Sequence, residues 1–450
     1  MSGTAAERVM SVGGHDIGYP HGHLGCLTTE EENALQNFKV YLEEQGLYRS
    51  SPEPSHDDQT LLRFLRARKW VVQDAYKQFK DTEEWRKANQ LELLYDTIDV
   101  DAYEKTRSLY PQWTGRRDRR GIPIYLFQIR HLDSKTVAAY EKSAESTNVS
   151  KAQTDGSTPQ RLLRLFALYE NLTHFTQPLC TEMTDRDNAR TPITLSTNIV
   201  DVSQVSLRMF WNLKAHMQAA STLATAHYPE TLDRIFIIGA PYFFSTVWGW
   251  IKRWFDPITV SKIFILSPSE VKPTLEAFIE PRNIPKAYGG ELEFEFFDRP
   301  NLDPKIRDAV TWENGYTDFP EGPAYWRPID DGKRLECLAV GSKDGKERRE
   351  RVCTIPVAFP RDEEPAPAAA AAVAPETKVA AEPAEAPAAT SAADADQTAA
   401  PATSSNISAE VEIQAIQGLS IADDKTTDEV SEKVVGQAEK PEQKTTTVSA

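Results

Sequence analysis

The sequence has little cysteine and no long apolar run. Its four cysteines are widely spaced and form no CxxC pair: they are Cys26, Cys180, Cys337 and Cys353. Neither a zinc site nor a disulfide framework is therefore indicated. The N-terminus lacks the basic start and apolar stretch of a signal peptide, and no segment reaches the ~18 apolar residues that a membrane span requires. We expect a reduced, cytoplasmic protein.

Motifs of common enzymes are also lacking. There is no GxSxG, HExxH or GxGxxG sequence. Residues 341–347 resemble a phosphate-binding loop only faintly, because three residues separate the glycines, Glu347 replaces Ser or Thr, and no strand is predicted before them. His21 and His23 lie in a glycine-rich leader, where a solvated loop is the simpler interpretation. We predict a non-enzymatic protein without catalytic residues, metal or cofactor.

The negative charge is concentrated at the C-terminus. The formal charge of the whole chain is −16. Residues 362–450 hold 17 acidic and 5 basic side chains, a net of −12, and contain no Phe, Tyr or Trp. A segment rich in Ala, Pro, Thr, Ser and Glu cannot bury enough apolar surface to offset its chain entropy. We expect residues 333–450 to be a largely disordered tail.

The N-terminal region predicts helices. After a flexible leader at residues 1–27, a small helical bundle is expected over residues 28–95. Thr28 and Glu31 offer a capping box for the first helix. The second helix begins near Asp57 and the third near Val72, and apolar residues at helical spacing are Leu35, Phe38, Leu42, Phe79 and Trp85.

Residues 100–297 predict an α/β fold. Short β-branched runs alternate with helical patterns, which favours a mixed sheet covered by helices on at least one face. Glu291–Phe296 alternates and is either an edge strand or a closing extension. Residues 298–332 carry aromatic anchors, so we expect them to pack back on the core. Strands are predicted at residues 121–127, 193–201, 234–238 and 262–266, and helices at 160–183, 206–225, 242–255 and 271–279.

Several blocks in order along the chain carry a family resemblance. They are Leu61–Trp70, Tyr110–Trp113, Asp118–Tyr125, His227–Leu232, Ala240–Ser245, Asp256–Leu266 and Asn283–Gly290. Over about Thr28–Phe297 the chain resembles the CRAL-TRIO lipid-binding family, close to the fungal phosphatidylinositol/phosphatidylcholine transfer proteins. The resemblance implies a helical N-terminal lobe joined to an α/β lobe whose sheet floors a deep lipid cavity.

The resemblance also implies a phosphatidylinositol headgroup site. Such a headgroup requires cations for its phosphate and hydrogen-bonding groups for its hydroxyls. The matching positions give Arg68 and Lys262 to the phosphate, with Lys69 beside them. Thr259 donates to the phosphate, and Glu230 accepts from a hydroxyl or orients a cation. The alternative is an Arg68–Glu230 salt bridge between the lobes with a solvated Lys262.

A phosphatidylcholine site is implied less completely. A quaternary ammonium group favours an aromatic cage. Tyr125, Tyr169 and Ser196 match the family, whereas Thr114 replaces an aromatic ring and Asn198 replaces a hydroxyl. Phosphatidylinositol is therefore the safer ligand. The alternative is that the tyrosines only pack in the core.

Residues 242–255 are rich in aromatic side chains. In the family the corresponding helix gates the cavity and meets the membrane, a role that interfacial Trp and cations suit. The alternative is an ordinary core helix. The gate residues that the resemblance implies are Phe244, Trp248, Trp250, Lys252, Arg253, Trp254 and Phe255.

The resemblance implies a phospholipid carrier. It is expected to be a monomer that does not bind nucleic acid, contacts membranes transiently, and associates peripherally with the Golgi or other endomembranes. A functional link to lipid kinases is also implied. The alternative is a module of the same fold that binds another hydrophobic ligand, such as a sterol or terpenoid, as a sensor.

Overall fold

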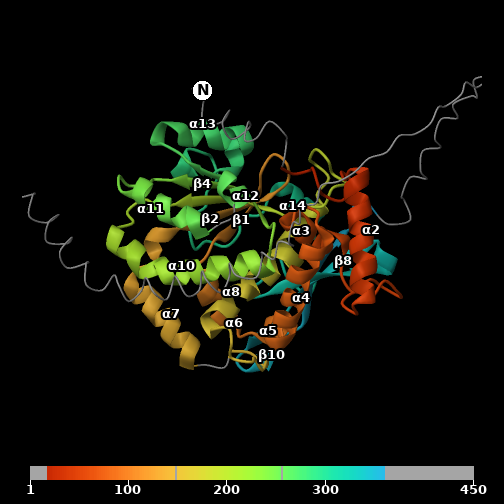
Figure 1. The fold of residues 1–450 in the computed structure, drawn as a ribbon. Helices are drawn as coiled ribbons and strands as arrows, with labels where there is room; N and C mark the ends of the chain where they lie inside the picture. Colours follow the sequence, from red (N-terminus) through yellow and green to blue (C-terminus); the bar gives the residue numbers. More distant parts are fainter. Residues whose placement is uncertain (1–17, 147–148, 255–256, 360–450) are drawn as a thin grey trace, which may run out of the picture. The chain divides into compact units, whose positions relative to one another are not determined.

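The computed structural model describes residues 18–146, 149–254 and 257–359, all within one compact unit. The N-terminal part is helical, as predicted. Thr28 and Glu31 form the capping box, with the Glu31 amide donating to the Thr28 hydroxyl at 3.2 Å and the Thr28 amide donating to the Glu31 carboxylate at 2.9 Å. The first helices are α2 (Thr29–Glu44), α3 (Asp58–Ala67) and α4 (Val72–Ala88) (Figure 1).

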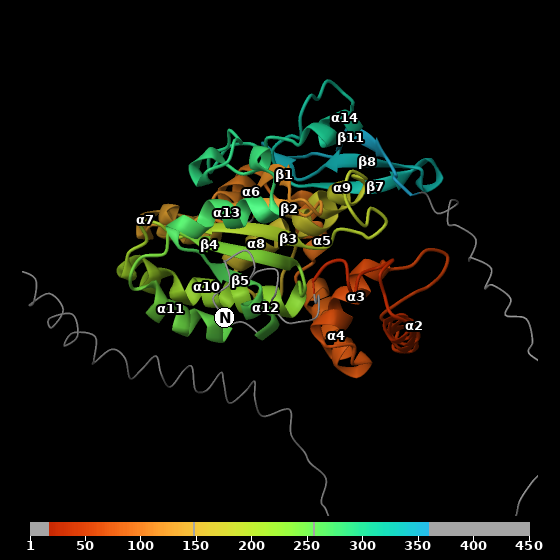
Figure 2. The same ribbon diagram turned by 90° about the horizontal axis from the view of Figure 1, so that it is seen from above.

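A buried apolar cluster holds these three helices together. Phe38 and Phe79 meet edge to face at 6.0 Å, and Phe64 meets Phe79 in the same way at 5.1 Å. Leu35, Leu42 and Leu61 are also buried in this cluster. Figure 2 shows the three helices grouped beside the rest of the described chain.

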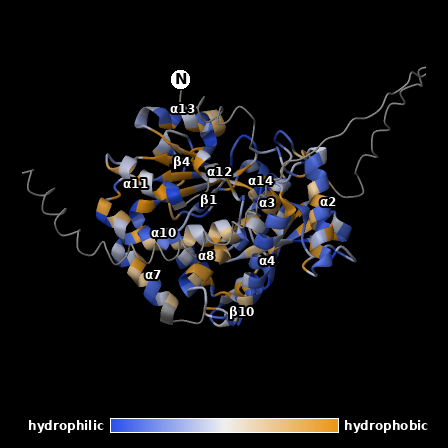
Figure 3. Ribbon diagram, in the orientation of Figure 1, coloured by the Kyte–Doolittle hydropathy of each residue, from blue (hydrophilic) through white to orange (hydrophobic). Residues whose placement is uncertain are grey.

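A five-stranded mixed sheet follows, and this confirms the predicted fold class. Strand β1 is antiparallel to β2, and the remaining pairs are parallel. The strand order is β1-β2-β3-β4-β5, and the central strands are largely hydrophobic (Figure 3). Their bounds are β1 (Gln112–Arg117), β2 (Pro123–Gln128), β3 (Ser196–Asp201), β4 (Leu232–Ile238) and β5 (Ile263–Ile265).

Helices cover the sheet and fill the connections. A π-turn at Leu172–Thr176 joins α8 to α9, so the long predicted helix contains this irregularity. Short helices α5 and α6 precede β1. The bounds are α5 (Leu91–Thr97), α6 (Val100–Arg107), α7 (Ser134–Ser146), α8 (Gln160–Asn171), α9 (Gln177–Thr181), α10 (Leu207–His227), α11 (Phe244–Ile251), α12 (Pro257–Ser261), α13 (Pro268–Phe278) and α14 (Pro304–Ala309).

The period-2 alternation of the strands gives the sheet two different faces. Ile124, Ile199 and Phe236 pack against α13 in one core cluster. Ile235 and Ile237 of β4 face the other way and pack with residues of α10 and α11. The polar side chains of β3 that point to this second face are the ones that matter for the candidate site.

The tail does not begin at residue 333, so that predicted boundary is wrong. A second, antiparallel sheet contains β6 (Thr311–Trp312), β7 (Ala324–Ile329), β8 (Arg334–Ala339) and β11 (Glu350–Pro356). Val352 and Ile355 are fully buried beside Trp113 of β1. The short strands β8 and β11 bury enough apolar surface to be ordered. The prediction missed them because it extended the Ala/Pro-rich composition of residues 362–450 to the segment that begins at residue 333. The acidic tail itself lies outside the described residues.

The segment compared with a phosphate-binding loop is a β-hairpin. Strands β9 (Ser342–Lys343) and β10 (Lys346–Glu347) pair across Asp344 and Gly345. Both turn residues have positive φ, 53° and 74°, as a two-residue type I′ turn requires. Strand β8 precedes the hairpin directly, so the expectation of no strand there is also wrong. Leu292 forms a single bridge to Pro285, which makes residues 291–296 a closing extension.

The end of the leader is ordered, contrary to the prediction. Tyr19 is 5% exposed and its hydroxyl donates to the Thr191 carbonyl at 2.8 Å. His23 is 4% exposed, so it is not a solvated loop residue. Arg66 of α3 donates to the Gly22 carbonyl at 3.0 Å, and these contacts anchor residues 18–27. Burial lowers the pKa of His23 to about 3.

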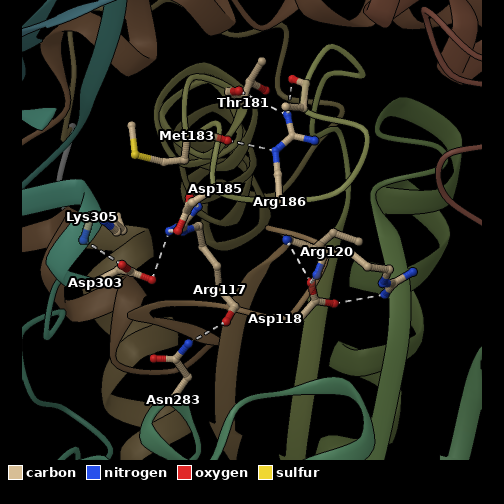
Figure 4. Close-up of polar contacts among 12 residues, drawn as sticks. Arg117, Asp118, Arg120, Thr181, Met183, Asp185, Arg186, Asn283, Asp303 and Lys305 are labelled. Carbon is tan, nitrogen blue, oxygen red and sulfur yellow. Dashed lines mark hydrogen bonds and ion pairs between the residues drawn. The ribbon is translucent and has the colours of Figure 1, made fainter. Parts of the chain in front are cut away.

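A buried arginine fastens one edge of the main sheet. Arg117 of β1 donates to both carboxylate oxygens of Asp185, at 2.8 and 3.1 Å, and lies 3.2 Å from Asp303 (Figure 4). Asp185 follows α9 and Asp303 precedes α14, so one guanidinium joins three segments. A buried charge is tolerated because it is paired and hydrogen-bonded.

Two truncations test the corrected boundary. A chain that ends at Gly332 loses β8 and β11 and exposes Trp113 and its neighbours, and removing large core side chains costs about 3–5 kcal/mol each. We expect this chain to be insoluble or to melt far below the full-length protein. A chain that ends at Phe359 keeps every described strand and serves as the control. Thermal melting that is equal for both truncations would contradict the boundary.

Candidate ligand-binding cavity

A cavity of about 560 Å³ lies among α3, α8, α10 and the strands β2 and β3. Apolar side chains make up much of its wall, and charged ones come from three separate segments. Its lining comprises Ala67, Arg68, Lys69, Gln78, Tyr110, Pro111, Tyr125, Leu165, Leu168, Tyr169, Leu172, Ser196, Asn198, Ala220, Ser221, Ala224, Thr225, Tyr228, Pro229, Glu230, Thr231, Leu232, Thr259 and Lys262.

All five expected headgroup residues line this cavity. The Lys262 ammonium donates to Glu230 at 3.0 Å and to the Leu232 carbonyl at 3.0 Å. Glu230 therefore pairs with Lys262, and the alternative Arg68–Glu230 salt bridge is absent from the part of the chain that the structure describes. Within the same part, the exposed Arg68 and Lys69 side chains form no ion pair.

Backbone strain marks two of these residues. Lys69 follows the C-cap of α3 with φ 51°, and Glu230 follows the end of α10 with φ 54°. Non-glycine residues adopt this left-handed conformation at a cost, and such residues often cluster at ligand sites. The strain at Lys69 ends α3 and leaves the side chains of Arg68 and Lys69 at the cavity wall.

Four of the five residues expected at a choline headgroup line the same cavity, and Thr114 does not. Thr114 is fully buried in β1, where its hydroxyl donates to the Ile124 carbonyl at 3.1 Å. It cannot contact a ligand in this cavity without displacement of β1, so its proposed role is wrong. Asn198 donates to the Ser196 hydroxyl at 3.1 Å, and Tyr125 donates to the Thr176 hydroxyl at 3.2 Å.

Two further tyrosines belong to the wall and were not predicted. The ring of Tyr228 stacks on Tyr169 with centroids 4.9 Å apart and on Phe166 at 5.5 Å. Tyr110 lies 2.6 Å from the His216 ring nitrogen of α10. Burial raises the pKa of Tyr169 to about 12, so its hydroxyl stays neutral. Tyr110 and Tyr228 both lie inside sequence blocks that carry the resemblance, but no sequence pattern distinguishes a tyrosine that lines the cavity from one that packs in the core.

The predicted gate helix lies outside the described lining of the cavity. Phe244 is buried in the core with Leu213 and Ile237, so for this residue the core-helix alternative holds. Trp250 is partly exposed and its ring meets Trp211 of α10 at 5.2 Å. Trp248 is likewise partly exposed, Lys252 and Arg253 are exposed, and the Trp254 side chain and Phe255 lie outside the described residues.

A buried carboxylate joins the helical part to the wall of the cavity. Glu170 of α8 accepts from both terminal nitrogens of Arg86 of α4, at 2.7 and 3.1 Å, and also from the Tyr228 hydroxyl. Burial opposes its charge, but Arg86 and His174 hold the pKa of the Glu170 carboxyl well below its usual range. Next to this pair, His227 stacks on Trp85 at 4.1 Å with nearly parallel rings.

Neither a metal site nor a membrane-spanning helix is found among the described residues. No group of three or more His, Cys, Asp or Glu side chains is arranged for a metal ion within residues 18–146, 149–254 and 257–359. Over the same residues, every helix is too short or too polar to cross a bilayer.

Comparisons with known proteins agree with this geometry. The CRAL/TRIO domain matches residues 107–290, and the CRAL/TRIO N-terminal domain matches residues 34–81. The SEC14 cytosolic factor of Eremothecium gossypii is 29% identical over 67% of this chain and 89% of its own length. The Sec14 cytosolic factor of Schizosaccharomyces pombe is 30% identical over 61% of this chain and 87% of its own. The phosphatidylinositol/phosphatidylcholine transfer protein SFH9 of Arabidopsis thaliana is 28% identical over 62% of this chain and 46% of its own.

The contact of His227 with α4 makes stability depend on pH. Burial, with a smaller contribution from Arg86, lowers the pKa of His227 to about 4, whereas an unfolded histidine titrates near about 6.5. Between these values the unfolded chain takes up the proton first, so stability falls as pH is lowered from about 6.5 to about 4. Between about pH 7 and pH 5, the free energy of unfolding of the His227→Gln variant should fall by about 1–2 kcal/mol less than that of the wild type, as measured by urea unfolding. The exposed His21→Gln is the control, and a wild-type slope in His227→Gln would refute the assignment.

Proposed function

The chain belongs to the CRAL/TRIO family, and we propose that it is a phospholipid transfer protein that carries one phosphatidylinositol molecule in the cavity described above. The observation that supports this most strongly is the lining itself. Arg68, Lys69, Glu230, Thr259 and Lys262 all face one cavity whose remaining wall is largely apolar. An amphiphile with an anionic, hydroxyl-rich headgroup satisfies both parts of such a wall.

The charges fit a phosphoinositol headgroup in particular. Arg68 and Lys69 are exposed and lack an ion pair among the described residues, so they are available to a phosphate as charge-assisted donors. Glu230 is the acidic residue of the lining, and its pair with Lys262 fixes both groups. A sugar hydroxyl can donate to Glu230 while the phosphate accepts from the cations.

Phosphatidylcholine is the second ligand that we propose. Four tyrosines line the cavity: Tyr110, Tyr125, Tyr169 and Tyr228. Aromatic rings attract a quaternary ammonium group, and Ser196 and Asn198 offer donors to its phosphate. Thr114, which stands where the family has an aromatic ring, is absent from the lining, whereas Tyr228 supplies a ring that the sequence did not reveal.

An uncharged sterol or terpenoid is the competing ligand. Its chemistry uses the apolar wall but offers nothing to Arg68 and Lys69, which form no ion pair among the described residues, and this is costly if the ligand excludes water. We therefore favour a phospholipid. Three further proposals rest on the family resemblance alone. The protein resides in the cytoplasm and associates peripherally with the Golgi or other endomembranes. It is a monomer, and it delivers lipid to lipid kinases.

We also propose a membrane-contact surface formed by α10 and α11. Trp211 is 45% exposed and lies against Trp250, with the Lys214 ammonium 4.9 Å from the Trp211 ring centre. Lys252 and Arg253 are exposed just after α11. Tryptophan and cations are the side chains that bind at the surface of an anionic bilayer.

Removal of the headgroup cations tests the ligand. Arg68→Ala and Lys262→Ala should each lower phosphatidylinositol transfer between vesicles about tenfold or more, because a charge-assisted phosphate contact is lost. Arg282→Ala and Lys272→Ala remove exposed cations that do not line the cavity and are the matched controls. Native mass spectrometry identifies the bound lipid. Wild-type transfer by both site variants, or a co-purified sterol, would overturn the proposal.

Loss of the exposed tryptophans tests the membrane-contact surface. Trp211→Ala together with Trp250→Ala should slow lipid exchange several-fold while the melting temperature changes by only a few degrees, since neither side chain is fully buried. Lys252→Glu and Arg253→Glu should weaken binding to anionic liposomes most at low salt. Lys87→Glu, on the exposed side of α4, is the control for charge reversal. Marked destabilisation with unchanged exchange per folded molecule would instead identify a core contact.

A further inference from the structure

The exposed cations of the cavity, Arg68 and Lys69, belong to an unusual helix end. The Lys69 amide donates to the Arg66 carbonyl at 3.1 Å, and the Trp70 amide donates to the Leu65 carbonyl at 2.8 Å. These two hydrogen bonds form the Schellman motif, which closes many α-helices and here closes α3. Its left-handed position is usually a glycine, but in this chain it is Lys69, with φ 51°. The position that strains the backbone therefore carries a cation of the cavity wall.

A second strained residue follows directly. Trp70 also has a positive φ, 66°, and a bulky residue keeps this conformation only where its surroundings fix it. Two consecutive left-handed residues, neither of them glycine, disfavour such a helix end in isolation. The Lys69 side chain is exposed and the Trp70 side chain is half-buried. The contacts of the Trp70 ring must therefore stabilise the turn.

The leader at residues 18–27 supplies part of these contacts. Gly22 is buried and lies so close to the ring that an added Cβ atom would be 3.2 Å from Cζ2 of Trp70. Its φ is 68°, a conformation that glycine adopts without strain. Leu24 and Leu27 pack against the same apolar cluster as Trp70. A larger side chain in place of Gly22 would push the leader and the ring apart.

Arg66 of α3 fastens the leader in this position. Its guanidinium donates to the Gly22 carbonyl at 3.0 Å and to the Thr194 hydroxyl at 3.5 Å. Burial lowers the pKa of Arg66 to about 10, and Glu230 opposes this shift, so the guanidinium stays charged at neutral pH. Arg66 is absent from the lining of the cavity. Its hydrogen bonds therefore hold the leader rather than a ligand.

We propose that Gly22 is a positioning residue for phosphatidylinositol binding. Together with Arg66 it holds the leader against Trp70, and the fixed ring holds the two preceding cations where one phosphate contacts both. The inference rests on the function proposed above and adds the leader to the elements that build the site. The leader precedes residue 34, where the match to the CRAL/TRIO N-terminal domain begins. Gly22 does not line the cavity, so it acts through the cations and not by contact with the lipid.

Gly22→Ala tests this inference, because the added methyl group moves the leader away from Trp70. Phosphatidylinositol transfer between vesicles should fall about fivefold, whereas phosphatidylcholine transfer per folded molecule should change by less than about twofold. The two lipids differ because the residues proposed for the choline headgroup lie elsewhere in the wall. An equal fall for both lipids, or unchanged phosphatidylinositol transfer, would overturn the inference.

Gly46→Ala is the matched control for backbone strain. Gly46 has nearly the same φ, 71°, but nothing lies within 4 Å of an added Cβ atom. The variant should lose stability through strain and still transfer both lipids as wild type does per folded molecule. Arg66→Gln releases the leader without added volume and should reproduce the selective loss of phosphatidylinositol transfer. An equal loss of both lipids in Arg66→Gln would contradict the positioning role.

A double-mutant cycle separates this inference from the proposed function. Arg68→Ala combined with Lys69→Ala removes the cations that the leader is inferred to hold. In that background Gly22→Ala should lower phosphatidylinositol transfer no further, whereas a fully additive loss would identify a general structural role and refute the inference. Wild-type transfer by the Arg68→Ala, Lys69→Ala variant would overturn the headgroup site itself. Loss of transfer in that variant together with normal transfer in Gly22→Ala would overturn only the role of the leader.

Discussion

The pair formed by Glu170 and Arg86 holds the helical part of the protein against the wall of the cavity. Glu170 is 2% exposed, so its charge survives only because Arg86, His174 and the Tyr228 hydroxyl surround it. Loss of one partner from such a buried pair typically costs about 3–5 kcal/mol. Tyr228 is both a partner of Glu170 and part of the cavity lining. The contact that joins α4 to α8 therefore also fixes the position of one wall of the ligand site.

The sheet contributes the opposite wall through its alternation. On β3, Ile199 points to the apolar cluster under α13, while Ser196 and Asn198 point to the cavity. Two polar side chains at these positions would be costly in a dry core. Here the Asn198 amide donates to the Ser196 hydroxyl at 3.1 Å, so each side chain has a hydrogen-bond partner. One face of the sheet thus stabilises the fold, and the other remains free for recognition.

Sequence reasoning succeeded where a local pattern is strong. The capping box at Thr28 and Glu31, the β-branched runs and the helical spacing predicted the first three helices and four of the five strands of the mixed sheet, whereas β1 and the helices α5, α6 and α7 were not predicted. It failed where order depends on distant partners. Strands β8 and β11 are short, and only their contact with Trp113 and its neighbours makes them stable. Thr114 was misplaced because the face that each position of β1 takes follows from its register with β2, where Trp113 pairs with Tyr125, and β1 itself was not predicted.

The cations of the cavity differ in how a ligand can reach them. Arg68 and Lys69 are exposed, so mobile ions screen them and a ligand must displace little structure to reach them. Lys262 is instead held by Glu230 at 3.0 Å, so its charge is already balanced before a ligand binds. The exposed pair therefore favours rapid exchange of a headgroup at a membrane, and the Lys262–Glu230 pair supplies a fixed point against which the headgroup can be oriented.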